Sequence, residues 1–214
     1  MKNAIIAFIV LLAGRASAQN LVINNAFVKL VGSSNIIQFD SASGAIKANG
    51  GGIQTHKGTG VVWRIKGTGT DQYTVPFSNQ AGTPIPVKYQ NASAGSPAKL
   101  RFQTWSADST ELAGVGSSVY LNRLWKIDGM QRPATIEIKY ADADIPQSLL
   151  GESLLSITRL WKGQWTLAEN TIVNPAQNSI SYFANDSASY STNWAVIEID
   201  IPLSTNIRWI DYEC

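Results

Sequence analysis

Apolar and polar residues alternate with a period of two along much of this chain, and after the first eighteen residues no stretch keeps a helical apolar period. Successive side chains of a strand lie on opposite faces, so this alternation predicts sheets with one buried face and one solvated face. The sequence therefore predicts an all-β protein. The clearest expected strands are Val61–Lys66, Lys99–Thr104, Thr135–Tyr140, Leu154–Trp161, Asn178–Phe183 and Trp194–Ile201.

Turn-forming residues separate these strands. They occur at Gly67-Thr68-Gly69, Gly95-Ser96-Pro97, Asp128-Gly129 and Asn174-Pro175. Short strands joined by such turns are typical of a sandwich. We expect an antiparallel β-sandwich, jelly-roll or Ig-like, over residues 60–203, followed by a C-terminal tail over 204–214.

Residues 19–59 differ in composition from the rest of the chain, because they have short apolar pairs among many Asn, Ser and Gly residues. We expect a short Asn/Gly-rich β leader segment here. Gly50–Gly52 is the expected boundary, because glycine adds backbone freedom without packing. Within this segment Leu21–Leu30 is strand-like, and we expect its unpaired edge to be able to pair with a neighbouring copy.

Residues 1–18 have the features of a signal peptide. Lys2 precedes an apolar run from Ala4 to Gly14, and small residues at Ala16 and Ala18 suit cleavage before Gln19. The run is too short to span a bilayer comfortably. We therefore expect export through the inner membrane and a mature protein without a membrane span.

The mature chain has no excess of charge. Without Lys2 and Arg15 of the signal peptide, 15 basic residues balance 15 acidic ones. Nucleic acids and anionic membranes select clustered Lys and Arg, so the composition argues against both as the main partner. The single cysteine, Cys214, rules out a disulfide within the chain, so stability must come from packing.

Asp142 and Asp144 stand one residue apart in KYADADIP, directly after an expected strand. A calcium loop needs oxygen ligands at several alternating positions and a glycine for the turn, and this stretch lacks the glycine and a third acid. Short Asp side chains also bond to backbone groups where a strand ends. A structural turn is the main interpretation, and calcium is the alternative.

No residue pattern indicates catalysis. The lone histidine, His56, lies in a glycine-flanked loop, THKGTG, without the further ligands that zinc requires and without a nucleophile elbow. A glycosidase would need two facing carboxyl groups, which a sequence cannot reveal. We expect no catalytic residue, no cofactor and no bound metal.

The seven tryptophans are the strongest indication of ligand binding. Trp63 and Trp194 belong to apolar alternation and are expected in the core. Trp161 and Trp165 flank a tight turn, Lys162-Gly163-Gln164, and are the candidates for contact with a glycan. The alternative is that they too are buried.

Several short motifs in a fixed order carry a family resemblance. They are VVWRIKGTGTDQYTVPFSN (61–79), LNRLWKID (121–128), IEIKYADADIP (136–146), LLSITRLWKGQWT (154–166) and SASYSTNWAVIEI (187–199). Together they resemble the β-sandwich modules of Bacteroidetes surface and gliding-associated proteins, many of them exported by the type IX secretion system.

The resemblance implies a non-catalytic role in structure or adhesion at the cell surface, with a protein partner or self-association. In that family KYADADIP would be a scaffold feature. A carbohydrate-binding module, with a polysaccharide as partner, is the alternative. The last residues, STNIRWIDYEC, contain no recognisable type IX sorting domain. The resemblance implies the cell surface or the extracellular space as the location, and the lack of a recognisable sorting domain makes the periplasm the alternative.

Overall fold

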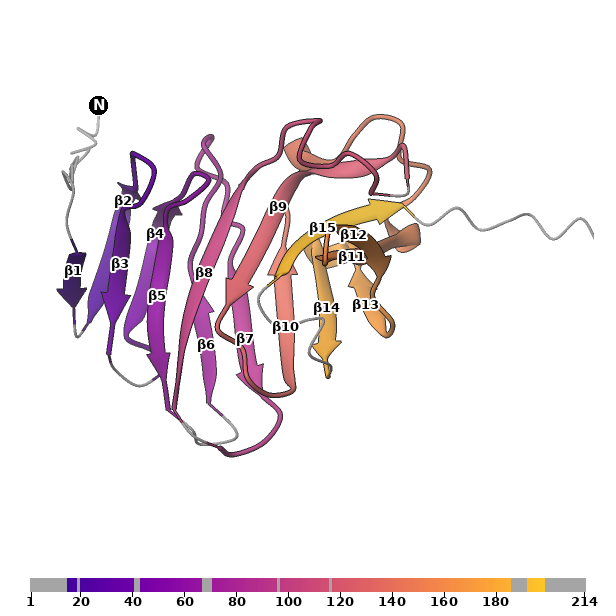
Figure 1. Cartoon of the computed structure of the whole chain (residues 1–214). Helices are drawn as coiled ribbons and strands as arrows, with labels where there is room; N and C mark the ends of the chain where they lie inside the picture. Colours follow the sequence, from indigo (N-terminus) through magenta and orange to yellow (C-terminus); the bar gives the residue numbers. More distant parts are fainter. Residues whose placement is uncertain are drawn as a thin grey trace, which may run out of the picture.

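Two packed layers of strands form this protein (Figure 1). The computed structural model describes residues 15–18, 20–40, 43–66, 71–95, 97–115, 117–185 and 192–198. Within these ranges there is no α-helix, and therefore no helix that could cross a membrane. The predicted all-β sandwich is confirmed. The turn at Gly67-Thr68-Gly69, the tail over 204–214, Trp209 and Cys214 lie outside the described residues.

The first layer is a sheet of eight strands. In spatial order they are β1 (Arg15–Ala18), β3 (Ile36–Phe39), β5 (Gly60–Ile65), β8 (Ala98–Ser106), β9 (Tyr120–Asp128), β15 (Thr192–Glu198), β11 (Leu155–Trp161) and β12 (Gln164–Leu167).

The second layer is a five-stranded sheet continued by a pair of strands. The sheet contains, in spatial order, β13 (Thr171–Asn174), β14 (Ser179–Ala184), β10 (Ala134–Lys139), β7 (Val87–Asn91) and β6 (Gln72–Val75). The pair is β2 (Leu21–Lys29) with β4 (Ile46–Gln54), and a bridge between Ile53 and Phe77 joins it to the chain after β6. Three 3-10 turns complete the described elements, η1 (Asp142–Asp144), η2 (Glu152–Leu154) and η3 (Pro175–Gln177).

All six expected strands are present. The alternation that predicts them comes from residues that lie between the layers, as in β10, where Ile136 and Ile138 are buried and Thr135 is exposed. The boundaries differ from the expected ones by one or two residues, and the end of the last expected strand beyond Glu198 falls outside the described part.

The N-terminal strands pair in parallel. Leu21 pairs with Ile46 and Ile37 with Val61, so the chain returns to an equivalent position after 24 or 25 residues. We call residues 21–39 the first rung and residues 46–65 the second rung. The two rungs stack like consecutive turns of a β-solenoid, which the antiparallel pattern expected from the sequence did not include.

Polar and glycine residues also stack between the rungs. The Asn49 side-chain amide donates a hydrogen bond to the Asn24 oxygen at 2.9 Å. Asn25 and Gly50 both have positive φ, 48° and 82°, so the two stacked strands kink at neighbouring positions. Gly50–Gly52, expected as a domain boundary, lies inside β4, and residues on both sides of it belong to one hydrophobic core.

Large aromatic side chains fill the space between the layers. Trp63 of β5 meets Tyr73 of β6 edge-on, with ring centroids 5.2 Å apart. Tyr89 of β7 meets Phe102 of β8 at 6.1 Å. Each contact joins a strand of the first layer to a strand of the second, and such pairs add about 0.5–1.5 kcal/mol to the burial itself.

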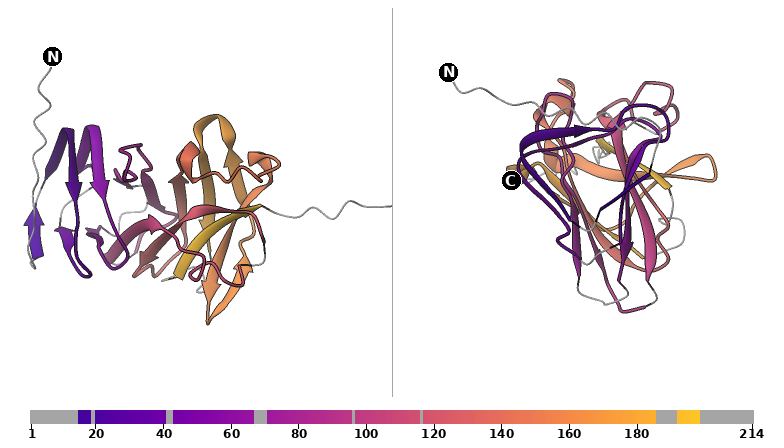
Figure 2. Two further views of the ribbon diagram at one scale, coloured as in Figure 1. Left: turned by 90° about the horizontal axis from the view of Figure 1, so that it is seen from above. Right: turned by 90° about the vertical axis from the view of Figure 1, so that its left-hand side faces the viewer.

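A smaller apolar cluster lies apart from this main core. It contains Trp105, Leu112, Val115, Leu124, Ala195 and Ile197. Leu112 and Val115 belong to the connection between β8 and β9, and the other four residues come from β8, β9 and β15. This packing holds the connection against the first layer, where β8 finishes and β9 begins. Figure 2 shows the backbone of the protein from two further sides.

The stacking of the rungs predicts a strong difference between two glycines. A Cβ at Gly51 would lie 1.7 Å from the Ala26 carbonyl oxygen of the neighbouring rung, whereas a Cβ at Gly44 would meet nothing within 4 Å. Both glycines have a φ near 85°. Gly44→Ala should therefore cost only the left-handed backbone penalty of about 1–2 kcal/mol. Gly51→Ala should lower the free energy of unfolding several-fold more than Gly44→Ala does. Urea titrations measure both losses, and equal losses would contradict the close approach of the two rungs.

Candidate functional site

The two aspartates of KYADADIP have different surroundings. Asp144 is buried in η1, and its carboxylate accepts hydrogen bonds from Arg123 Nε at 2.8 Å and from Arg123 Nη2 at 3.2 Å. Arg123 is itself 4% exposed and shares one face of β9 with Leu121 and Trp125, which both belong to the main core. Because η1 directly follows β10, this two-pronged ion pair ties the second layer to the first.

Asp142 faces outward. Its carboxylate accepts a hydrogen bond from the Asn178 side chain. The two aspartates thus have separate partners, and both oxygens of Asp144 bind Arg123. Among the residues that the structure describes, no group of three His, Cys, Asp or Glu side chains is close enough to hold a metal ion.

Asp144→Ala should be severely destabilising, because it leaves the Arg123 guanidinium buried without its counter-charge. We expect a loss of about 3–5 kcal/mol in the free energy of unfolding. Asp142→Ala, at the exposed position two residues earlier, is the matched control and should cost less than about 1 kcal/mol. Chemical denaturation of both variants measures this difference. A rise in melting temperature with calcium that Asp142→Ala removes would point instead to the calcium alternative.

Tyr140, directly after β10, forms a hydrogen bond with a carboxylate, that of Glu152. Its hydroxyl donates a hydrogen bond to Glu152 Oε2 at 2.5 Å. Burial, followed by the bond to Glu152 and its negative charge, raises the pKa of the Tyr140 hydroxyl well above its ordinary value. The folded protein therefore keeps this proton under conditions in which an unfolded tyrosine loses it.

This raised pKa predicts a loss of stability at alkaline pH. Below about pH 10 the hydroxyl is protonated in both states, so it adds no pH dependence. Above that pH the unfolded state releases the proton first, and the free energy of unfolding falls. Tyr140→Phe should make this fall shallower in urea titrations between about pH 8 and 11. An unchanged slope would contradict the shift.

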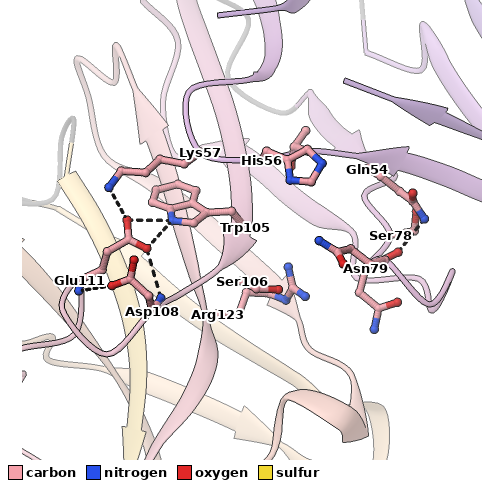
Figure 3. Close-up of a pocket in the computed structure, with 12 residues that line it drawn as sticks. Gln54, His56, Lys57, Ser78, Asn79, Trp105, Ser106, Asp108, Glu111 and Arg123 are labelled. Carbon is pink, nitrogen blue, oxygen red and sulfur yellow. Dashed lines mark hydrogen bonds and ion pairs between the residues drawn. The ribbon is translucent and has the colours of Figure 1, made fainter. Parts of the chain in front are cut away.

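A polar pocket lies at the end of the sandwich where β4 and β8 finish (Figure 3). Its volume is about 290 Å³. Its walls come from β4 and the loop after it, from residues 78–80 after β6, from the end of β8 with the following turn, and from Arg123 of β9. The pocket therefore combines residues of both layers.

One wall is made of neutral polar side chains. Gln54 and Asn79 are about 5% and 6% exposed, and Gln54 Nε2 donates to the Asn79 carbonyl oxygen at 2.8 Å. Asn79 Oδ1 accepts a hydrogen bond from the Thr83 backbone at 2.8 Å. Ser78 is 3% exposed, and its hydroxyl has no hydrogen-bond partner in the described part of the protein.

The opposite wall carries one cation and two carboxylates, and each of them is bound by groups of the chain itself. Lys57 Nζ lies 2.8 Å from Glu111 Oε1, and the Trp105 indole nitrogen donates to both Glu111 oxygens at 3.1 Å. Asp108 accepts bonds from the Thr110 hydroxyl and from backbone groups of the same turn, which lowers its pKa. The bond to Glu111 raises the pKa of Lys57.

Hydrogen bonds from Thr59 and from side chains of β8 hold the loop that carries His56 in place. Thr59 Oγ1 accepts a bond from the His56 backbone N–H at 2.8 Å and donates to the His56 carbonyl oxygen at 3.0 Å. Gln103 of β8 donates to the Thr59 carbonyl oxygen at 2.8 Å, and Arg101 donates to that of Gly58. The exposed His56 ring therefore sits on a fixed loop, and in Figure 3 it lies between Trp105 and the amides of Gln54 and Asn79.

The residues that the sequence singles out do not all gather at this pocket. His56 lines it, whereas Trp165 lies on β12 and packs, partly buried, against the smaller apolar cluster. Trp165 pairs with Leu160 across the hairpin, and Trp161 pairs with Gln164. The side chain of Trp161 is outside the described part of the structure. Trp63 and Trp194 are fully buried, as predicted.

Most of the pocket was not foreseen. Gln54, Asn79 and Arg123 are separated widely in sequence, and the motifs that contain Asn79 and Arg123 carry no sign of a binding role. The only local signal is a polar stretch, Gln54 to Lys57, directly after the apolar end of β4. Polar side chains buried at the end of a strand indicate a site only once their partners are known.

Comparisons of the chain with protein-family models, with curated proteins and with solved structures give no match.

Proposed function

We propose that this protein is a secreted, non-catalytic β-sandwich protein that serves structure or adhesion at the cell envelope or surface. The proposal joins the signal peptide, the resemblance to Bacteroidetes surface modules and the open N-terminal end of the fold. Its partner is a second copy or another protein of a surface assembly.

The open end of the first rung is the observation that carries this proposal. β2 pairs with β4 on one side and, among the described residues, with no strand on the other. An unpaired edge offers backbone donors and acceptors to a further strand. Val22 on this strand is 55% exposed, and Asn24 stands at the start of an amide stack that another rung would continue.

The signal peptide adds to this argument. β1 pairs in parallel with β3 and consists of residues 15–18, which lie before the expected cleavage site. Cleavage before Gln19 would remove β1 and leave β3 as the edge of the eight-stranded sheet. Processing would then open both layers at the same end, which is how stacked rungs are extended.

The state of the acids near the pocket supports a non-catalytic role. Glu111 is bound by Lys57 and Trp105, and Asp144 is bound by Arg123. A general acid or base has to exchange its proton with a substrate, and these carboxylates are engaged by groups of the chain itself.

Carbohydrate binding is the second candidate function. The sequence assigns it to Trp161 and Trp165, and Trp165 remains partly exposed on an edge hairpin. The polar pocket, with amides beside an indole and an imidazole, is a further observation in its favour. Such side chains recognise hydroxyl groups and ring faces.

The edge-pairing proposal predicts self-association that increases after processing. The chain beginning at Gln19 should form dimers or larger species with rising concentration in light scattering and sedimentation, whereas the chain that retains the leader should associate less. N-terminal sequencing of the protein from fractionated cells identifies the processed end and its location. A monodisperse monomer at all concentrations, or a cytoplasmic location, would refute the proposal.

Val22→Lys tests which edge is used. A lysine on an exposed edge strand disfavours pairing with another strand, so this variant should associate markedly less. Ile172→Lys is the matched control, because Ile172 is 69% exposed on β13, an edge strand at the far side of the five-stranded sheet. It should associate like the unmodified chain. The reverse pattern would assign association to β13 and exclude the rungs.

A further inference from the structure

We infer that the polar pocket is a binding site for a single neutral sugar unit, such as the terminal residue of a glycan. This inference rests on the proposed adhesive role and assigns it a ligand class. It also moves the ligand site away from the Trp161–Trp165 hairpin.

Unused hydrogen-bonding atoms are the first argument. In the described interactions Gln54 uses its amide nitrogen and Asn79 uses its amide oxygen. The oxygen of Gln54 and the nitrogen of Asn79 are therefore available to a ligand, whereas the unpartnered Ser78 hydroxyl is covered by the chain itself. A hydrogen bond from a ligand to either of these two atoms would contribute about 0.5–1.5 kcal/mol net.

This set of atoms matches hydroxyl groups. The Gln54 wall supplies one acceptor, the Gln54 side-chain oxygen, and one donor, the Asn79 side-chain nitrogen. Sugar hydroxyls also donate and accept, so neighbouring hydroxyls of one ring can bind both atoms together. An apolar ligand would leave both of them unpaired.

The ion pairs of the pocket disfavour an anionic ligand. The pocket is lined by two cations, Lys57 and Arg123, and two anions, Asp108 and Glu111. Lys57 is paired with Glu111, and Arg123 is paired with Asp144 behind the wall. An anionic ligand would have to displace Glu111 from Lys57 or Asp144 from Arg123, whereas a neutral ligand leaves both pairs intact.

Shape and aromatic surface complete the match. A volume of about 290 Å³ is at the small end of ligand pockets, so it suits one ring and not a polysaccharide chain. The His56 ring and the Trp105 indole line the same cavity, so a sugar has aromatic surface beside the polar wall (Figure 3). The loop bonds below His56 fix this surface before any ligand arrives.

Binding of defined sugars tests the inference. The purified protein is mixed with methyl glycosides of glucose, galactose, mannose, fucose and N-acetylglucosamine, and binding is followed by saturation-transfer NMR and calorimetry. At least one glycoside should bind with a dissociation constant in the millimolar range or tighter. If none binds, the cavity holds only water and the inference is wrong.

Variants then locate the bound sugar. Asn79→Ala should raise the dissociation constant at least tenfold. Because Asn79 is buried and its loss can impair folding, His56→Ala at the exposed wall is the second variant, and a weakening of several-fold is expected. Trp165→Ala is the control and should leave binding unchanged. Sugar binding that survives both pocket changes, or that Trp165→Ala abolishes, would overturn the assignment.

The outcome is separable from that of the proposed function. Self-association and surface location are measured without sugar, and the glycoside titrations are made on purified protein. An associating surface protein that binds no glycoside would leave the proposed function standing and remove the pocket assignment. Sugar binding by a protein that neither associates nor leaves the cytoplasm would keep the pocket assignment and remove the proposed function.

Discussion

Packing between two sheets is the constraint on which this structure depends. With one cysteine in the chain, no internal disulfide can hold the layers together. Aromatic side chains from both sheets fill the space between them instead, and Trp63, Trp125 and Trp194 are each at most 1% exposed. Removing one such side chain costs about 3–5 kcal/mol in other cores, a large part of the stability of a domain.

The buried Arg123–Asp144 pair is a different kind of link between the layers. Aromatic packing tolerates small shifts, but a charge inside the core requires its partner at hydrogen-bond distance. The pair therefore specifies where η1 meets β9 more than it adds net stability. Asp144 also neutralises the charge of Arg123, which lines the polar pocket. The scaffold and the candidate site therefore share Arg123.

Local patterns predict the antiparallel part of the fold well, and the reason is physical. Strands such as β10 and β11 have one face in the core, so burial imposes alternation that can be read directly. The parallel rungs were missed because β2 and β4 hold Asn and Gly residues at their kinks, which interrupts alternation. Their signal lies at long range, where apolar residues such as Ile37 and Val61 recur at the rung spacing.

The candidate site was harder to foresee for the same reason. Gln54, Asn79 and Arg123 come from three parts of the chain, and their roles depend on which side-chain atoms the fold leaves without partners. Asp144 illustrates the limit, because its place after a strand indicates a turn but not the arginine that it binds. A sequence shows which residues can be buried, whereas their partners are set only when the layers close.

The open rung end and the pocket involve the same strand. β4 stacks on β2 along its length and delivers Gln54 to the pocket at its end. Gly51 lies between these two features and allows the rungs to approach closely. The proposed assembly edge and the Gln54 wall thus share one pair of strands, so the close approach at Gly51 supports both.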